Sequence, residues 1–377
     1  MEPRGPSFGR GFMLSPQGWP YLLVPFIPLA IALDLAHAAS GLIFFSAALG
    51  VIPTAALMGR ATEEVASKSG PGIGGLLNVT FGNAPELIIA LFALGAGLQE
   101  VVKASIVGSI LGNILLVMGA AMLAGGLKDG RKFQRFDRTA ANVQSMMLFL
   151  AVAALVMPAV FELVEGKGLP SVGPERVDYD STVEHLSLAV AIVLIATYVI
   201  GLFFSLRTHR DLFNPDYGEH DDTWGWSIRK SIIALALAGV AVGVMSEILV
   251  GSIEAASEAV GLSEFFIGVI VVAIVGNAAE HWVAVLVAVK DKMDLSVNIA
   301  IGSSAQVALF VAPVLVLASF VMGPGPMPLV FNGFEIAAVI IASLIAYQVT
   351  NEGESTWFEG VQLLAVYLIL ALAFYYA

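Results

Sequence analysis

Two short motifs place a carboxylate and a carboxamide inside apolar runs of the sequence. They read Gly-Asn-Ala-Pro-Glu and Gly-Asn-Ala-Ala-Glu, and they end at Glu86 and Glu280. The asparagine of each motif, Asn83 or Asn277, precedes the glutamate by three residues, so both side chains share one helix face. A single copy could be a helix-packing kink whose glutamate reaches the membrane interface. Two copies in register favour a ligand site, because an ionisable group inside the membrane is costly.

The backbone of both motifs is predicted to leave the helix. Gly82 and Gly276 weaken it, and Pro85 removes an amide donor from the first motif. Broken helix at membrane depth is tolerated where the freed backbone groups line a cavity or meet a ligand. We therefore expect broken helices at both motifs, with carbonyl oxygens as ligands.

The apolar run after each motif adds a second layer of polar groups. In the first half, Ser109 follows Gly108 and Asn113 follows Gly112, and these two glycines are spaced for close approach of another backbone. In the second half, Ser303 and Gln306 lie three residues apart on one helix face. Serines in membrane helices often bond only their own helix carbonyls, so the matching position in both halves is what favours a site.

The pooled donors are carboxylate, carboxamide, hydroxyl and carbonyl oxygens. This hard set suits Ca²⁺, Mn²⁺ or Mg²⁺, and flexible coordination favours Ca²⁺. The sequence has no cysteine, which excludes thiolate metal sites and disulfides. On a helix His281 points about 100° away from Glu280. This direction favours a role in tuning the carboxylate or in packing over a role as a metal ligand. The predicted metal donors are Gly82, Asn83, Glu86, Gly276, Asn277, Glu280, Ser303 and Gln306.

The two glutamates suggest how cation binding could be coupled to protons. Two empty, desolvated carboxylates that repel each other take up protons, whereas a bound dication favours the charged pair and expels them. Protons and metal then compete, and Glu86, Glu280 and His281 are the predicted proton-coupling residues. If the site opens to one side at a time, this competition produces antiport. Ca²⁺ is then a transported substrate, and no cofactor is expected.

The composition is that of an integral membrane protein, since 58% of the 377 residues are hydrophobic and 13% are charged. The short polar lead lacks the features of a cleaved signal. We predict an all-α fold with eleven transmembrane helices. They span residues 19–38, 40–59, 73–98, 101–124, 139–161, 183–206, 230–251, 263–289, 294–322, 331–349 and 357–376.

The basic residues predict the orientation. With a cytoplasmic N-terminus, fifteen of the eighteen lysines and arginines lie inside, and Lys103, Lys167 and Arg176 lie outside. The C-terminus is then outside. The basic cluster from Lys128 to Arg138 favours an anchor on anionic lipid over a gate. The expected partners are Ca²⁺, H⁺ and the lipid bilayer, with no nucleic acid. The short lead fits a prokaryotic plasma (inner) membrane.

The two motifs belong to an internal repeat. A shift of 194 residues without a gap aligns them and also pairs Glu64 with Glu258 and Gly108 with Gly302. Each copy holds five spans, so the second copy must enter the membrane from the opposite side, with the site at the repeat interface. The predicted domains are a lead with an extra helix (1–39), the first repeat (40–206), an acidic cytoplasmic linker (207–229) and the second repeat (230–377).

Acidic residues outside the motifs are weaker candidates. Glu247 lies inside a predicted span and could relay protons or form a structural pair. The acidic residues between 211 and 222 could bind regulatory Ca²⁺, but their spacing misses the EF-hand pattern, which favours a solvated linker. The secondary candidates are Ser109, Asn113, Glu63, Glu64, Glu247 and Glu258.

At these residues the sequence resembles the cation/proton exchanger family of the calcium/cation antiporter superfamily. The likeness runs from about Ala61 to the end and is carried by residues 74–88, 275–281, 302–306 and 352–357. It implies Ca²⁺/H⁺ antiport, ten core helices with one extra helix at the N-terminus, and Glu86 and Glu280 as central ligands. It also implies helper roles for Asn83, Asn277, Ser303 and Gln306.

Two further residues matter to this resemblance. Glu63 is similar to the family's acidic residue on the cytoplasmic side, which implies a role in feeding ions to the site. Gly112 stands where related sequences often have serine, which leaves Ser109 as the hydroxyl of the first half.

Three other functions fit parts of the sequence. A sodium/calcium exchanger of the same fold would be expected to carry a Thr/Ser-rich sequence after each glutamate, and both motifs lack one. An intramembrane enzyme could use the carboxylates as acid and base, but no nucleophile constellation or cofactor motif accompanies them. A passive channel would not need a titratable site. We therefore expect a transporter and not an enzyme, and the oligomeric state stays open.

Overall fold

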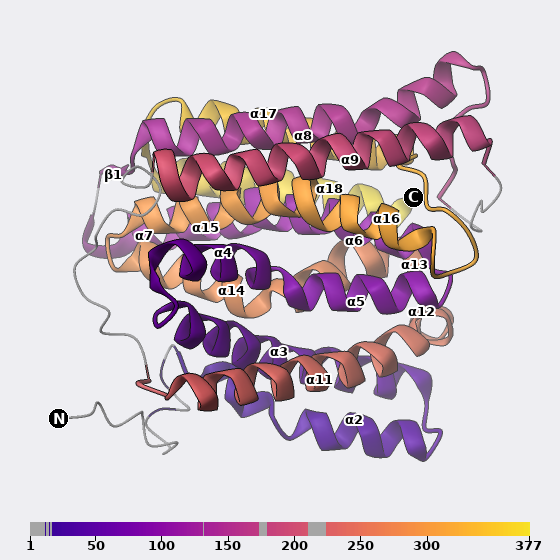
Figure 1. The fold of residues 1–377 in the computed structure, drawn as a ribbon, viewed down its shortest axis with the longest axis horizontal. Helices are drawn as coiled ribbons and strands as arrows, with labels where there is room; N and C mark the ends of the chain where they lie inside the picture. Colours follow the sequence, from indigo (N-terminus) through magenta and orange to yellow (C-terminus); the bar gives the residue numbers. More distant parts are fainter. Residues whose placement is uncertain (1–11, 13–14, 16, 131, 173–178, 210–223) are drawn as a thin grey trace. The chain divides into compact units, whose positions relative to one another are not determined.

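A computed structural model describes residues 12, 15, 17–130, 132–172, 179–209 and 224–377 (Figure 1). The described chain is almost entirely helical, with a single short pair of strands among these residues. The acidic stretch considered as a regulatory Ca²⁺ site, residues 211–222, lies outside the described residues.

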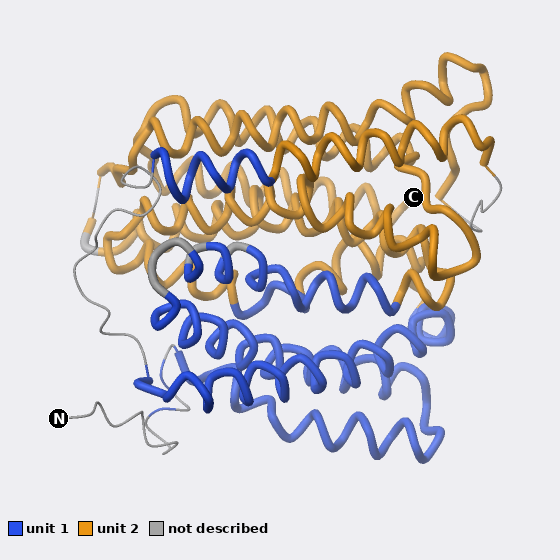
Figure 2. The backbone as a smooth tube through the Cα atoms, in the orientation of Figure 1, with its two compact units in different colours: residues 1–92, 199–260, 275–279 blue, residues 93–198, 261–274, 280–377 orange. Residues whose placement is uncertain are grey.

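The chain divides into two compact units, which Figure 2 distinguishes by colour. Unit 1 comprises residues 1–92, 199–260 and 275–279, and unit 2 comprises residues 93–198, 261–274 and 280–377. Each unit therefore takes helices from both halves of the sequence. The elements that begin in unit 1 are η1 (Trp19–Leu23), α2 (Phe26–Leu35), α3 (Ser40–Ala66), α4 (Gly70–Gly82), α5 (Ala84–Gly95), η4 (Phe204–Thr208), α11 (Ile228–Gly251) and α12 (Ile253–Val260).

The remaining elements begin in unit 2. Its first half consists of α6 (Gln99–Leu111), η2 (Gly112–Val117), α7 (Met118–Leu127), η3 (Lys128–Gly130), β1 (Gln134–Arg135), α8 (Arg138–Val164) and α9 (Ser181–Phe203). Its second half consists of α13 (Glu264–Phe266), η5 (Ile267–Val272), α14 (Ala273–Val289), α15 (Met293–Gln306), η6 (Val307–Val311), α16 (Ala312–Ser319), α17 (Gly333–Thr350), β2 (Glu354–Ser355) and α18 (Trp357–Tyr376). The end of α9 and residues 275–279 of α14 belong to unit 1.

Nine helices among the described residues are long and apolar enough to cross a membrane, and α4 with α5 makes a tenth if the bent pair counts as one span. The prediction that the chain is an all-α membrane protein is confirmed. The first of the eleven predicted spans, 19–38, forms only a shorter apolar helical segment, Trp19–Leu35. Pro25 explains why, because it lies at the junction of η1 and α2 and lacks the amide donor that a continuous helix needs.

Unit 1 is built around the pairing of α3 with α11. A methyl group on Gly50 of α3 would approach the Met245 sulfur of α11 to 2.8 Å, so the glycine permits this close packing. Met58 and Ala238 from the same two helices form a buried core with Ala84 of α5. The helix that carries Glu86 is therefore positioned by the α3–α11 pair.

Unit 2 is held by close backbone contacts between helices. A methyl group on Gly108 of α6 would overlap the Val269 carbonyl of η5, and one on Gly268 would lie 3.0 Å from Ala104. The close approach predicted at Gly108 is thus present. At one end of the unit, β1 and β2 pair antiparallel, with Gln134 opposite Ser355.

Several helix boundaries recur with the spacing of the two motifs. The helices α6 and α15 begin 194 residues apart, at Gln99 and Met293. The π-helical segments that follow them, η2 and η6, end at Val117 and Val311, again 194 residues apart. This recurrence supports an internal repeat, because π-helical turns are rare and unlikely to coincide by composition alone.

Candidate cation-binding site

The first motif breaks its helix, as predicted. The helix α4 ends at Gly82, Asn83 lies outside the regular helix, and α5 begins at Ala84, with a bend of 42° between the two helices. Pro85 occupies the first turn of α5, where its missing amide costs nothing. The carbonyl of Asn83 accepts from the Leu87 amide at 3.1 Å, which starts the new helix and fixes Glu86 in its first turn.

The second motif does not break its helix, and this prediction was wrong. Residues Gly276 to Glu280 lie inside the continuous helix α14. The reason is that Ala279 stands where the first motif has Pro85, so every amide of the second motif can donate within the helix. A lone glycine weakens a helix without breaking it. The irregular backbone lies earlier, in the π-helical segment η5.

Unit 1 brings together the first glutamate and the second motif's glycine. The position of a methyl group on Gly276 would be 3.2 Å from Cγ of Glu86 and 3.5 Å from Cδ1 of Ile89. The stem of Glu86 therefore packs directly on the Gly276 backbone, a contact that only glycine permits without displacement. The asparagines Asn83 and Asn277 of the two motifs are both buried, with 2% and 1% exposure.

Unit 2 brings together the second glutamate and a predicted hydroxyl donor. Ser303 Oγ of α15 donates to Glu280 Oε2 of α14 at 3.4 Å. Its neighbour Ser304 instead donates back to the Ala300 carbonyl at 3.0 Å. Gln306, one turn after Ser303, is half-buried at the end of α15.

The same unit links His281 to the first-half polar layer. His281 Nε2 lies 3.1 Å from Asn113 Oδ1, and Asn113 is 1% exposed. A methyl group on Gly112 would touch Cε1 of the imidazole at 3.7 Å, so this residue adjoins the ring. Ser109 is buried on the preceding turn. His281 thus contacts a carboxamide of η2.

The remaining secondary candidates lie away from these groups. Glu63 is 56% exposed at its side chain and pairs with Arg60 at 2.9 Å. Glu64 is buried, with partners of its own that are described below. Glu247 and Glu258 are exposed on α11 and α12. The repeat pairing of Glu64 with Glu258 therefore joins a buried carboxylate and an exposed one.

A buried ion pair on α6 was not predicted from the sequence. Lys103 was assigned to the outer loops, but it lies inside α6 with 1% exposure. Its ammonium pairs with Glu100, donates to the Val330 carbonyl at 3.0 Å and lies 5.8 Å from the Tyr179 ring. A lysine within an apolar span with a glutamate three residues earlier is the signal that could have found this pair.

The residues brought together are suited to a hard cation. Each unit supplies one glutamate with neighbouring amide, hydroxyl or backbone groups. Within the described parts of the chain no three histidine or acidic side chains gather as a metal cluster. Carboxylate oxygens accompanied by neutral amide, hydroxyl and carbonyl oxygens are the donors that Ca²⁺ accepts.

An all-helical membrane protein with carboxylates, carboxamides and hydroxyls inside its apolar spans belongs to the class of membrane ion transporters. The chain belongs to the sodium/calcium exchanger protein family, which it matches over residues 39–207 and 230–376. This match and the Ca²⁺/H⁺ antiporter relatives described next confirm the resemblance to cation/proton exchangers.

Relatives and a solved structure are similar over nearly the whole chain. The Ca²⁺/H⁺ antiporter of Synechocystis sp. is 44% identical over 94% of this chain and 96% of its own. The Ca²⁺/H⁺ antiporter ChaA of Bacillus subtilis is 43% identical over 93% of this chain and 96% of its own. The structure of native YfkE is similar with a TM-score of 0.79 and 40% identity, over 95% of this chain and 99% of that one.

Proposed function

We propose that this protein exchanges Ca²⁺ for H⁺ across a membrane. The observation that carries the proposal is the placement of Glu86 and Glu280 inside apolar helices at two matching motifs, each against groups that could share a cation. The names of the relatives from Synechocystis and B. subtilis support the same two transported ions. The transported cation would be bound by the motif oxygens with help from Asn83, Asn277, Ser303 and Gln306.

The proposed coupling is competition for the two carboxylates. With no metal bound, two glutamates in a shared desolvated site take up protons, since two adjacent charges are costly in a poorly solvated place. A dication restores the charged pair and releases the protons. Alternating exposure of the site to the two sides turns this competition into antiport. His281 would adjust the site through its contact with Asn113.

The domain organisation and orientation belong to this proposal. Two inverted five-helix repeats over 40–206 and 230–377 would meet at the site, joined by the linker 207–229. The two stretches that match the family, and the helix boundaries spaced by 194 residues, support these limits. The distribution of basic residues supports a cytoplasmic N-terminus. The bacterial relatives support a prokaryotic plasma membrane.

Ca²⁺ uptake into acid-loaded proteoliposomes tests the proposal. We expect uptake driven by the pH gradient in the wild type and none in Glu86→Gln or Glu280→Gln, because each loses a charge that the dication requires. Glu254→Gln, an exposed glutamate on α12, is the matched control and should transport normally. Ca²⁺ flux that ignores the imposed pH gradient would contradict the proposal.

The same vesicles separate the other functions. A Na⁺ gradient that drives Ca²⁺ uptake at constant pH would favour a sodium/calcium exchanger. Counterflow, in which internal Ca²⁺ accelerates uptake of labelled external Ca²⁺, is expected of an exchanger and not of a passive channel.

A further inference from the structure

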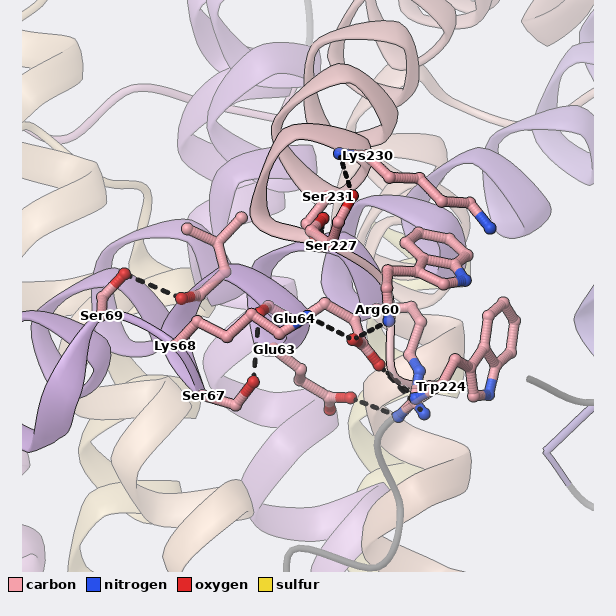
Figure 3. Close-up of polar contacts among 12 residues, drawn as sticks. Arg60, Glu63, Glu64, Ser67, Lys68, Ser69, Trp224, Ser227, Lys230 and Ser231 are labelled. Atoms are coloured by element: carbon pink, nitrogen blue, oxygen red, sulfur yellow. Dashed lines mark hydrogen bonds and ion pairs between the residues drawn. The ribbon is translucent and has the colours of Figure 1, made fainter. Parts of the chain in front are cut away.

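The end of α3 holds a buried carboxylate that the proposed exchange does not use. Glu64 is fully buried, and its two oxygens accept from backbone amides 160 and 162 residues away in the sequence. Trp224 donates to Oε1, and Trp226 donates to Oε2 at 3.0 Å. Figure 3 shows Glu64 with Trp224 and Arg60, and all of these residues belong to unit 1.

The backbone at Trp224–Trp226 has the form of an anion-binding loop. Gly225 lies between the two donors with a φ of +64°, a conformation that glycine adopts without strain. A left-handed residue between two amides lets both N–H groups converge on one anion. Here the anion is a side chain of the same protein.

Positive charges complete the site around Glu64. Arg60 and Lys68, one turn before and one turn after it on the helix, lie 3.7 and 3.8 Å from its oxygens. Exposed ion pairs of this kind contribute little. The Glu64 carboxylate is buried, however, so it requires positively charged partners. Hydrogen bonds to a charged group are also stronger than those between neutral groups.

The flanking aromatic rings make the contact specific for this segment. The Arg60 guanidinium lies 4.8 Å from the centre of the Trp224 ring, and the Lys230 ammonium lies 4.7 Å from that of Trp226. The two indole rings meet edge to face at 5.2 Å. Cations over aromatic faces add to the attraction.

We propose that the end of α3 is a binding site for the chain's own Trp224–Trp226 segment, with Glu64 as the anion that fastens it. The segment directly precedes Ser227, which caps α11 by accepting from the Lys230 amide. The site therefore ties the start of α11 to the end of α3. Glu64 is a positioning residue that acts through these helices on Glu86; it does not contact the transported ion.

Hydrogen exchange of the Trp224 and Trp226 amides, read by mass spectrometry on the intact protein, tests this site directly. Glu64→Gln loses the charge and presents a donor to one of the two amides, so exchange there should accelerate about tenfold or more. The matched control is Glu63→Gln, its exposed neighbour on the same helix, which should leave both amides protected. Equal acceleration in both variants, or none in Glu64→Gln, would overturn the proposal.

A second variant acts from the other side of the contact. Gly225→Ala strains the left-handed turn and leaves α3 intact, so it should also accelerate exchange at both amides. The transport measurement rests on the proposed Ca²⁺/H⁺ exchange. In that measurement, Glu64→Gln and Gly225→Ala should each lower the maximal rate and leave the KM for Ca²⁺ unchanged. The double variant should lower the maximal rate no further than the stronger single variant.

An increase of KM for Ca²⁺ in Glu64→Gln that Gly225→Ala does not reproduce would make Glu64 an ion ligand and refute the positioning role. The amide measurement needs no transport, so it stands even if the protein exchanges other ions.

Discussion

At the scale of single residues, two neighbouring serines on α15 have different tasks. Ser303 reaches across to Glu280, whereas Ser304 bonds the carbonyl of its own helix. The first arrangement adds an oxygen and a hydrogen-bond donor to the carboxylate that is proposed to bind the cation. The second is the ordinary way in which a membrane helix satisfies a hydroxyl.

This difference makes a prediction for alanine variants. Ser303→Ala should weaken Ca²⁺ binding by about 1 kcal/mol, or roughly fivefold, because it removes one long hydrogen bond and one oxygen at the site. Ser304→Ala should bind Ca²⁺ normally. The KM for Ca²⁺ in proteoliposomes measures both, and equal effects of the two variants would contradict the assignment.

We expect ion exchange to require glycine at position 276, because the Glu86 side chain lies against it. In Gly276→Ala the added methyl group would lie 3.2 Å from Cγ of Glu86, so the glutamate must shift by a few tenths of an ångström. We expect a cost of about 1–3 kcal/mol, seen as a loss of roughly 5- to 150-fold in exchange rate. Gly239→Ala, where no atom lies within 4 Å, is the control. Normal exchange by Gly276→Ala would refute the packing argument.

At the scale of the elements, one proline distinguishes two helices that otherwise carry the same motif. Pro85 leaves Asn83 outside the regular helix, while α14 runs through Asn277 without interruption. The two motifs therefore have different backbones: Asn83 lies at a break between two helices, whereas Asn277 lies within a regular helix. A repeat in sequence does not enforce a repeat in conformation.

The buried pair on α6 makes a prediction about stability. Lys103→Met should leave Glu100 without the buried ammonium with which it pairs. Removing one partner of a buried pair typically costs about 3–5 kcal/mol, so thermal unfolding in detergent should occur at a clearly lower temperature. Arg135→Met, whose ion pair with Glu354 is exposed, should change it little. Unchanged unfolding of Lys103→Met would show that this cluster does not stabilise unit 2.

At the scale of the whole molecule, the absence of cysteine allows a direct test of orientation. We predict that Ala377→Cys reacts with a membrane-impermeant maleimide from outside intact cells. Lys128→Cys should react only after permeabilisation, because the basic loop is proposed to be cytoplasmic. Both positions are exposed, so accessibility to the reagent depends on the side of the membrane. The reverse labelling pattern would invert the proposed topology.

The sequence alone determined the class of protein, the donor chemistry and the spacing between the two motifs. These properties depend on residue type and periodicity, which are local and can be read without a fold. The tertiary structure decided four other features. Glu86 packs on Gly276, Ser303 and not Ser304 contacts Glu280, Lys103 is buried, and Glu64 binds the Trp224–Trp226 amides. Each depends on which side chain faces which backbone across helices distant in sequence, and helical spacing specifies a face without specifying its neighbour.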